Sequence, residues 1–326
     1  MSEESHAASQ QPMKAHGLGL ATRRAGGGIL DTWFPDPRLG DVDSSRDPWL
    51  ELLNYQDDAQ PNPLLGTEID LVQVEIELHK APQSVEDVYL RLHLLSHRLV
   101  KPNSINLDGI FTILPNVIFT NHGPMHPDDY HRRRMSLQRA GVSAHSLDRF
   151  PRLIDYVVPT GVRISDANRV RLGAYLAEGT TVMHEGFVNF NAGTLGPSMI
   201  EGRISQGVVV GSGSDIGGGA SVMGTLSGGG RERIRIGERC LLGANSGIGI
   251  SLGDDCVVEA GLYITAGSRV TVVHPEERSP MANRVQKAVE LSGISGILFR
   301  RNSQSGVIEA ISRQGVGVQL NHTLHA

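Results

Sequence analysis

The sequence predicts a mainly β protein whose central part is a parallel β-helix, with an N-terminal α/β domain before it and a short C-terminal cap after it. Three observations support this prediction. An aliphatic residue recurs at every sixth position, a small residue follows four positions after most of them, and the chain has 39 glycines but only 5% aromatic residues. A helix repeats near 3.6 residues and an exposed strand near 2, so neither explains a period of six. A hexapeptide repeat is typical of a parallel β-helix, in which each coil stacks on the previous one.

The period of six runs from Ile164 to Val270. Its aliphatic positions are Ile164, Val170, Leu176, Val182, Val188, Val210, Ile216, Val222, Ile236, Leu242, Ile248, Leu252, Val258, Ile264 and Val270. We expect these side chains to fill a narrow triangular interior, with the small residues at the bends between faces. Glycine suits such bends because it adopts positive φ. Since these coils bury a core only by stacking, residues 160–272 should form one rigid solenoid.

The repeat is interrupted at 193–209 and again at 224–235. Insertions in a solenoid leave the coil, so both segments are predicted to project from one edge. We assign residues 159–273 to the solenoid and 274–326 to the cap. Within the cap, the sequence predicts a loop over 274–282, a short helix near 283–292 and a hairpin around Gly306.

Residues 1–158 are assigned to the N-terminal α/β domain. Residues 68–79 alternate apolar and acidic side chains, which predicts a half-buried strand. Ser84 followed by Asp87 is a helix start signal, with apolar residues at helical spacing after it. A second strand-like run covers 109–120, and a helix is expected near 127–141.

Charge and cysteine content limit the possible partners and compartment. A net charge of -5 and a pI near 6.2 argue against a nucleic-acid-binding surface. No apolar stretch reaches the roughly 18 residues of a membrane span, so we expect a cytoplasmic protein without membrane or nucleic-acid partners. Cys240 and Cys256 both occupy the small position of the repeat. They are therefore predicted to be buried, reduced thiols on one face of neighbouring coils.

Chemistry is sought in residues that the repeat itself does not require. Glu201 and Arg203 lie two residues apart in the first interruption, on one side of an extended segment. Such a pair suits acyl transfer, because the carboxylate can accept a proton or attack an acyl carbon while the guanidinium holds a carboxylate substrate. A plain surface ion pair is the alternative reading of the same spacing.

Histidines give little support for a metal enzyme. His184, next to Glu185, is the only histidine between 164 and 273, so the solenoid cannot supply the three histidines of a β-helical zinc site from one region of the chain. His122, His126 and His131 have a suggestive spacing, but intervening prolines do not favour one ligand-bearing face, and we interpret them as surface residues.

Glycine runs and tail cations could bind a phosphate-bearing ligand. The stretches 211–219 and 224–230 could offer free backbone N–H groups to an oxyanion or a pyrophosphate, or could simply form corners. Lys287, Arg300 and Arg301 stand where a capping segment could meet the phosphates of a nucleotide, although solvated surface charges explain them equally well.

Long strings of the sequence carry a resemblance to a known family. They are MHEGFVNFNAGTLGPSMIEGRIS at 183–205, then GSDIGGGASVMGTLSGGG, CLLGANSGIGISLGDDCVVEAGLYITAG and LFRRNS, with GLGLAT and LDTWFP near the start. With them the chain resembles the tetrahydrodipicolinate N-succinyltransferases of the actinobacterial type over nearly its whole length. The resemblance implies a homotrimer of left-handed β-helices with active sites between subunits. It also implies succinyl transfer from succinyl-CoA in lysine and diaminopimelate synthesis.

The resemblance also assigns roles to single residues. Glu201 falls on the family's catalytic glutamate, which is proposed to form an acyl anhydride. Positions that bind succinyl-CoA fall on Arg203, Gly218, Ser221, Ala244, Glu259, Ala260, Gly267, Lys287, Arg300, Arg301, Asn302 and Ser303. Glu185 falls on a metal-binding acid near the threefold axis, where the family binds magnesium. The second metal acid aligns with Asn168, an amide, although Asp166 lies two residues earlier.

Two other functions stay open at this level. One is another acyl-CoA transferase on the same solenoid, such as a serine or sugar acetyltransferase, which its acyl-donor preference would distinguish. The other is a non-catalytic trimeric scaffold, which would not bind coenzyme A at all.

Overall fold

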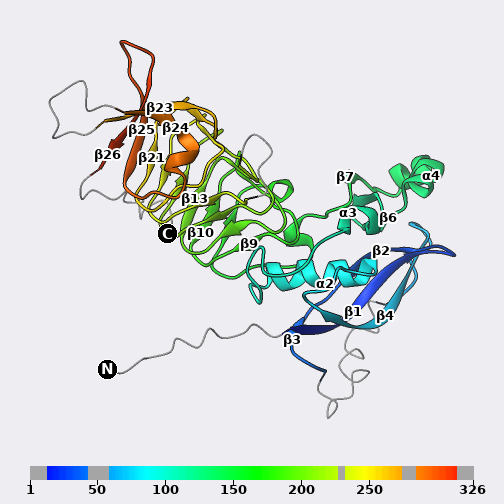
Figure 1. Cartoon of the computed structure of the whole chain (residues 1–326). Helices are drawn as coiled ribbons and strands as arrows, with labels where there is room; N and C mark the ends of the chain where they lie inside the picture. The colour runs from blue at the N-terminus through cyan, green and yellow to red at the C-terminus, as the bar shows by residue number, and fades with distance from the viewer. Residues whose placement is uncertain (1–12, 43–58, 227–231, 274–283, 314–326) are drawn as a thin grey trace, which may run out of the picture. The chain divides into compact units, whose positions relative to one another are not determined.

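A computed structural model describes residues 13–42, 59–226, 232–273 and 284–313 of the chain. The chain divides into two compact units (Figure 1). The first comprises Met1–Arg91 and Ile105–Arg149, and the second comprises Leu92–Ser104 and Phe150–Ala326. Within the described residues, no helix is both long and apolar enough to cross a membrane.

The first unit contains two antiparallel sheets. Strand β1 (Lys14–Arg24) lies at the centre of the larger sheet and pairs with β2 (Ile29–Trp33), β3 (Arg38–Leu39) and β4 (Thr67–Glu77). The smaller sheet has the order β6 (Gly123–Met125), β5 (Val117–Thr120) and β7 (Ala144–Asp148). The expected strand at 68–79 is confirmed as β4.

Two of the helices between residues 85 and 139 begin where the sequence predicts them. Helix α2 (Val85–Ser96) starts after Ser84, whose hydroxyl accepts a hydrogen bond from the Asp87 N–H at 3.2 Å. Helix α4 (Pro127–Arg139) confirms the helix expected near 127–141. The strand over 109–120 is wrong in its first half, because 110–113 form the short helix α3 (Ile110–Ile113) and only β5 is extended. Gly109, at φ 84°, turns the chain into that helix, a conformation that favours glycine.

The second unit is a three-faced solenoid of parallel strands (Figure 1). The first face contains β8 (Arg163–Ile164), β10 (Thr180–Val182), β13 (Ser198–Ile200), β16 (Asp215–Ile216), β19 (Leu241–Leu242) and β21 (Val257–Val258). The second contains β11 (Phe187–Val188), β14 (Arg203–Ile204), β17 (Ser221–Val222), β20 (Gly247–Ile248) and β22 (Tyr263–Ile264). The third contains β9 (Tyr175–Leu176), β12 (Gly193–Thr194), β15 (Val209–Val210) and β18 (Arg235–Ile236). Short 3₁₀ turns, η2 (Leu153–Asp155) and η3 (Ala167–Arg169), lie at its start.

The aliphatic residues of the repeat form the interior of this solenoid, as predicted. On the first face, Val182, Ile200, Ile216, Leu242 and Val258 are all fully buried and stack on one another in register. Burial of an aliphatic side chain contributes roughly 1.5–3 kcal/mol, so the column is the main source of stability on this face. Cys240 and Cys256 precede paired residues on neighbouring coils and are buried, free thiols, also as predicted.

The first interruption of the repeat is not an insertion, and that prediction is wrong. Strands β12 to β15 run through 193–209 and pair in register with the coils on either side. The pattern is lost for two reasons. Thr194, fully buried, takes an interior position, and its hydroxyl lies 2.6 Å from that of Thr180. The step from Ile200 to Ile204 is also four residues instead of six, so one corner is two residues short.

The second interruption does leave the coil. Thr225 forms an antiparallel bridge with Arg233, and the N–H of Leu226 donates to the Glu232 carbonyl at 3.0 Å. The tip, 227–231, lies outside the described residues. A second short corner follows, because Ile248 and Leu252 are also four residues apart while Leu252 still bridges Ile236 on the third face.

The C-terminal residues continue the first face of the solenoid. The hairpin expected around Gly306 is confirmed as β25 (Ile297–Arg301) and β26 (Ile308–Ser312), and β25 pairs in parallel with β21. The helix near 283–292 is wrong. Strand β24 (Arg284–Lys287) pairs with β23 (Arg269–Val273), and only η5 (Ala288–Leu291) is a 3₁₀ turn. The predicted loop at 274–282 lies outside the described residues.

Candidate active site

Many of the predicted site residues lie on one corner of the solenoid, where each coil passes from the first face to the second. We call this line of turns the site corner; it comprises residues 165–169, 183–186, 201–202, 217–220, 243–246 and 259–262. Backbone hydrogen bonds join successive turns. The Gly219 N–H donates to Glu201, Asn245 to Gly218 and Gly261 to Ala244, at 3.4, 2.8 and 2.8 Å. Residues that are far apart in sequence are therefore stacked about 4.8 Å apart.

Glu201 lies in the shortest turn of the site corner, residues 201–202. Because two residues are missing there, the N–H groups of Glu201 and Gly202 both donate to the Ile216 carbonyl, at 2.8 and 2.9 Å. Gly202 is packed so closely that a Cβ on it would lie 2.4 Å from the Ala220 carbonyl oxygen. The Glu201 side chain is partly buried and its Oε2 lies 3.5 Å from the Cβ position of Gly218. The carboxylate is thus held over the bare glycine turn of the next coil.

Side chains are disfavoured at two of the three glycines of that turn, Gly217 and Gly219. A Cβ on Gly217 would lie 2.5 Å from the Leu242 carbonyl oxygen, and Gly219 has φ +71° with Asn245 Oδ1 2.3 Å from its Cβ position. We expected free backbone N–H groups in the run 211–219, and this expectation is partly wrong. The Gly217 and Gly219 N–H groups are both used between coils, on Leu242 and Glu201.

Asp215, in β16, is a residue that sequence reasoning missed. It is half-buried, and its Oδ1 is inaccessible to solvent with no hydrogen-bond partner among the described residues. Burial, and next the nearby negative charge of Glu201, raise the pKa of the Asp215 carboxyl to about 6. The only signal in the sequence was an acidic residue directly before an interior aliphatic residue, Ile216.

Arg203 and Ser221 lie beside the site corner, at the start of the second face. Arg203 opens β14 and is exposed, and it pairs in register with Ser221 of β17 on the next coil. Glu201 and Arg203 do not form an ion pair in the part of the chain that the structure describes. The two side chains therefore belong to adjoining surfaces, and the ion-pair reading of their spacing is wrong.

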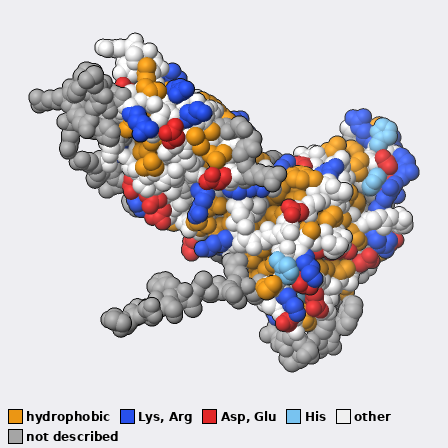
Figure 2. All heavy atoms as spheres, viewed as in Figure 1, with side chains coloured by type: hydrophobic (Ala, Val, Ile, Leu, Met, Phe, Trp, Pro, Cys, Tyr) orange, Lys and Arg blue, Asp and Glu red, His pale blue; other side chains and the backbone are white. Residues whose placement is uncertain are grey.

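The far end of the site corner meets the hairpin of β25 and β26. Glu259 Oε2 accepts a hydrogen bond from the Arg301 N–H at 2.6 Å, which ties the corner to the hairpin. Arg300 Nε and Asn302 Nδ2 both donate to the Glu309 carboxylate at 2.8 Å. Arg301 is exposed and its guanidinium contacts the Gly306 carbonyl. Figure 2 shows basic side chains gathered at this end of the solenoid, with acidic ones among them.

Three further predicted residues have different positions. Ala260, on the site corner, is exposed, and only its backbone is closely approached by the previous coil, where a Cβ on Gly243 would lie 2.4 Å from the Ala260 nitrogen. Ser303 is exposed in the turn of the hairpin. Gly267 is not on the site corner but in the turn between β22, on the second face, and β23. It lies near Lys287, whose strand β24 pairs with β23 at Arg269.

Glu185 and Asn168 also lie on the site corner, beyond Glu201. Glu185 Oε1 lies 3.1 Å from His184 Nδ1, and its Oε2 accepts from Arg169 at 3.2 Å. The Asn168 amide donates to Asp166 at 3.0 Å. Oxygen donors suit magnesium, but both Glu185 oxygens are paired and a guanidinium lies among them, which repels a divalent cation. These residues, as arranged in one chain, do not fit a magnesium site.

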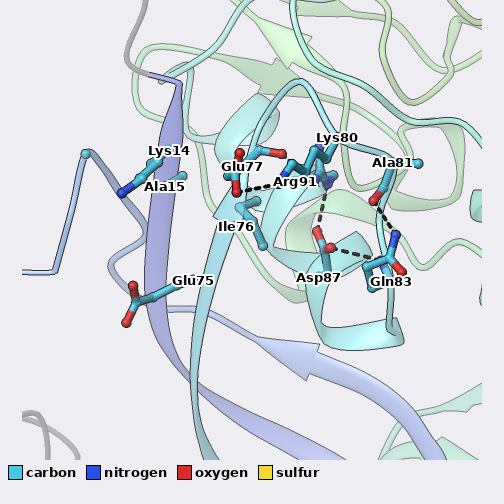
Figure 3. A pocket seen from close by; sticks show the side chains of 11 residues that line it. Lys14, Ala15, Glu75, Ile76, Glu77, Lys80, Ala81, Gln83, Asp87 and Arg91 are labelled. Atoms are coloured by element: carbon cyan, nitrogen blue, oxygen red, sulfur yellow. Dashed lines mark hydrogen bonds and ion pairs between the residues drawn. The ribbon is translucent and has the colours of Figure 1, made fainter.

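The remaining candidates do not form a second site. His122 and His131 are exposed, and the described residues contain no group of three histidine, cysteine, aspartate or glutamate side chains that could hold a metal. A cavity of about 360 Å³ lies in the first unit beside β1, β4 and α2 (Figure 3). Its innermost side chain, Arg91, is already paired with Asp87 at 2.7 Å and donates to the Leu78 carbonyl. The polar groups of this cavity thus stabilise the unit itself.

Fold and site together define a hexapeptide-repeat protein with a carboxylate at one bend of its coil. Residues 233–266 match the model described as the hexapeptide repeat of succinyl-transferase. Residues 71–112 and 114–152 match the N-terminal and middle models of tetrahydrodipicolinate N-succinyltransferase. The chain belongs to the tetrahydrodipicolinate N-succinyltransferase family.

Relatives and a solved structure support this assignment over nearly the whole chain. The 2,3,4,5-tetrahydropyridine-2,6-dicarboxylate N-succinyltransferase of Vibrio cholerae is 45% identical over 342 residues, covering 95% of this chain and 98% of the relative. The enzyme of the same name from Pseudomonas aeruginosa is 56% identical over 248 residues, covering 76% and 71%. A crystal structure of a Campylobacter jejuni protein, described as a 2,3,4,5-tetrahydropyridine-2-carboxylate N-succinyltransferase, has a TM-score of 0.79 at 32% identity and covers 95% of this chain and 94% of its own.

Proposed function

We propose that the protein transfers the succinyl group of succinyl-CoA to the amine of tetrahydrodipicolinate, in its ring-opened form 2-amino-6-oxopimelate, for lysine and diaminopimelate synthesis. The observation that carries the proposal is the site corner, which leads in register from Glu201 to the hairpin at Arg301. From the Glu201 turn to β25 it spans four coil steps, about 19 Å. The extended pantetheine arm of coenzyme A has a length of this order.

In this proposal the thioester lies beside Glu201 and the phosphates lie near the hairpin. The glycine turn at Gly218 leaves room for a thin, flexible chain along the corner. Arg301 is exposed for phosphates, whereas the charge of Arg300 is partly neutralised by Glu309. Arg203, exposed beside the corner, can hold a substrate carboxylate with two hydrogen bonds. Gly267 and Lys287, at a different corner of this chain, would contact the coenzyme from another part of its path.

The reaction forms an amide and releases a thiol. The substrate ammonium must lose a proton before its nitrogen can attack the thioester carbonyl carbon, and the C–S bond then breaks so that the sulfur leaves as the thiol of coenzyme A. Glu201 can serve in two ways. As a base it takes the proton from the ammonium; as a nucleophile it attacks the thioester first and forms an anhydride, which the amine then opens. The family resemblance favours the nucleophile.

Assembly belongs to the same proposal. A homotrimer of left-handed coils would place a second chain against the open side of the site corner and exclude water from the thioester. A cytoplasmic location follows from the two substrates, which are metabolites of the cell interior. The resemblance implies magnesium at Glu185 and Asn168, but these residues as arranged in one chain do not fit it, and no step above depends on it.

The direct test is release of coenzyme A from succinyl-CoA in the presence of tetrahydrodipicolinate. We expect turnover with succinyl-CoA to exceed that with acetyl-CoA at least about 100-fold, because only the succinyl group offers a second carboxylate to an arginine. Turnover of acetyl-CoA with serine or a sugar would instead support the alternative transferase. If calorimetry detects no binding of coenzyme A or succinyl-CoA, the scaffold function is correct and the proposal fails.

A further inference from the structure

One row of side chains on the second face points outward and begins beside the site corner. Strands β14, β17, β20 and β22 pair in register, at steps of about 4.8 Å. The first residue of each strand faces outward, because the second is fully buried in the solenoid. We call these four outward residues the outer row; they are Arg203, Ser221, Gly247 and Tyr263.

The aromatic ring of Tyr263 lies over Gly247. A Cβ on Gly247 would collide with Cζ, Cε1 and Cε2 of the ring, which are the atoms at its hydroxyl end. The long axis of the ring therefore runs from β22 to β20, and the hydroxyl continues along this axis toward Ser221. An aromatic ring can cover a strand glycine, but phenylalanine would cover Gly247 equally well. Packing thus explains the ring and leaves the hydroxyl unexplained.

The outer row has hydrogen-bond donors that the chain itself does not use. Arg203 is exposed, and its guanidinium makes no ion pair or hydrogen bond within the described residues. The hydroxyls of Ser221 and Tyr263 make no hydrogen bond there either, and Tyr263 is 45% exposed. On the other side of Arg203 the row is bounded by Phe187, whose ring has the Arg171 guanidinium 5.9 Å from its centroid. The row contains no acidic side chain that could neutralise Arg203.

We propose, on the basis of the proposed function, that Tyr263 is a specificity-determining residue whose hydroxyl binds, together with Arg203 and Ser221, a carboxylate of one of the two substrates. A carboxylate accepts about four hydrogen bonds, and a guanidinium and two hydroxyls can all donate to it. Arg203 and Ser221 are one coil step apart, and the Tyr263 hydroxyl extends toward Ser221 from the next step, so the three donors lie along roughly 10 Å. An arginine side chain is long enough to bring its guanidinium to the other two.

The position of the row suits a carboxylate that is remote from the reacting atoms. Arg203 follows Glu201 by two residues, so the row adjoins the surface where the acyl group is transferred. Both the succinyl group and the amine substrate carry such a carboxylate, whereas an acetyl group does not. A site built to pair a charged group discriminates strongly against a ligand that lacks it.

The first experiment compares Tyr263→Phe with the wild type, because this change removes the hydroxyl and keeps the ring on Gly247. The KM of the substrate whose carboxylate is bound should rise about tenfold with kcat within about twofold, since a hydrogen bond to a charged group is lost equally in the ground state and the transition state. Tyr175→Phe is the matched control. It removes an outward tyrosine hydroxyl on the third face and should change neither quantity.

The same assay identifies which substrate carries the carboxylate. If the row binds the succinyl carboxylate, KM rises for succinyl-CoA and not for acetyl-CoA, so the preference between the two falls about tenfold. If the row binds the amine substrate, KM for tetrahydrodipicolinate rises and the preference between the thioesters is unchanged. Either result supports the proposal. KM values of Tyr263→Phe within twofold of the wild type for both substrates overturn it.

A second variant separates this role from packing. Gly247→Ala places a methyl where the ring of Tyr263 lies, so the ring must turn away and take its hydroxyl with it. KM should then rise by about the same factor as in Tyr263→Phe, and the double variant should be no worse than either single one. If Gly247→Ala lowers the melting temperature and leaves both KM values unchanged, the ring serves packing only and the proposal fails.

Calorimetry on the whole protein tests the outer row without turnover. The ligands are succinyl-CoA, acetyl-CoA and 2-aminopimelate, which keeps the amine and both carboxylates of the acceptor. Tyr263→Phe should bind succinyl-CoA or 2-aminopimelate about tenfold more weakly and acetyl-CoA as tightly as the wild type does. Such a loss in a protein that releases no coenzyme A would refute only the proposed function. Unchanged affinity for all three ligands would refute the role of Tyr263, even in an active enzyme.

Discussion

The solenoid contains two corners that are each two residues short, and only one of them has features of a reactive site. Between Ile200 and Ile204 the short corner carries Glu201, which is partly accessible. Between Ile248 and Leu252 the short corner carries Ile250 and Ser251, which are 0% and 8% exposed. The same shortening of the backbone therefore occurs in two different surroundings.

What covers each corner accounts for the difference. At the second corner the Ser251 N–H donates to the Ser292 hydroxyl at 3.1 Å, and the Gly293 N–H donates to the Ser251 carbonyl at 2.9 Å. The second corner thus packs against the segment after η5 and is covered by it. At the first corner, the turn of the next coil presents Gly217, Gly218 and Gly219 to Glu201, so the carboxylate stays partly accessible. A short turn can therefore serve structure alone. It can also be a reactive site when it carries a reactive side chain that no other segment covers.

Removing the acid from the first corner should have the largest effect. Glu201→Gln keeps the shape of the side chain but removes both its basicity and its nucleophilicity, so kcat should fall at least about 1000-fold. Release of coenzyme A measures the change. The exposed Glu178→Gln, elsewhere on the solenoid, is the control. Activity of Glu201→Gln within tenfold of the wild type would exclude both roles of Glu201.

Lengthening the first corner should reduce activity by a smaller factor. Two glycines inserted between Glu201 and Gly202 restore the usual six-residue step and let the carboxylate move away from Gly218. We expect kcat to fall about 100-fold, since a displacement of about 1 Å costs this much in an oriented site. The melting temperature should change little because full-length corners occur on the neighbouring coils. An unchanged kcat would show that the shortening is incidental to the site.

The same insertion in the second corner should act on stability. Two glycines between Gly249 and Ile250 separate Ser251 from Ser292 and Gly293, so two hydrogen bonds of the Ser251 backbone are lost, one to the Ser292 hydroxyl and one from the Gly293 N–H, and Ile250 is exposed. The free energy of unfolding should fall by about 3 kcal/mol, from about 1 kcal/mol for each hydrogen bond and about 1–2 kcal/mol for the aliphatic burial. Denaturant unfolding measures the loss. A greater loss of kcat here than at the first corner would contradict the comparison.

Two neighbouring glycines give the finest test of the first corner. Gly218→Ala places a methyl 3.5 Å from Glu201 Oε2, at ordinary contact distance, so kcat/KM for succinyl-CoA should fall only about threefold to tenfold with stability unchanged. Gly217→Ala forces a methyl to 2.5 Å from the Leu242 carbonyl oxygen and should cost about 1–3 kcal/mol of stability. Assays of both variants at equal folded concentration separate the two effects. Equal loss of stability in both would show that Gly218, too, serves only packing.

Much of the fold follows from the period of six, because interior aliphatic residues are set by local spacing. The exceptions have local causes. Thr194 is buried yet polar, since its hydroxyl is bonded to Thr180, and hydropathy alone cannot reveal that partner. The short helix at 110–113 contains β-favouring residues, but Gly109 turns the chain out of extended structure.

The site was predicted less completely than the fold. Glu201 stood out because an acid in a run of small and aliphatic residues needs a reason. Asp215 did not, because its burial and its closeness to Glu201 arise from coils that stack sixteen and more residues apart in sequence. The resemblance alone groups Gly267 with the succinyl-CoA positions. The structure shows that it lies in a different turn of the coil from the residues of the site corner.

The last strands of the solenoid have a consequence for solubility. A stack of parallel coils ends in an open row of backbone donors and acceptors, which could join another molecule and polymerise. Here β25 turns back antiparallel as β26, then β23 and finally β24 complete the sheet. The outermost strand, β24, carries Arg284 and Lys287 on mostly exposed positions, and like charges on two such edges repel. The chain thus ends its own repeat with a charged border that discourages fibre growth.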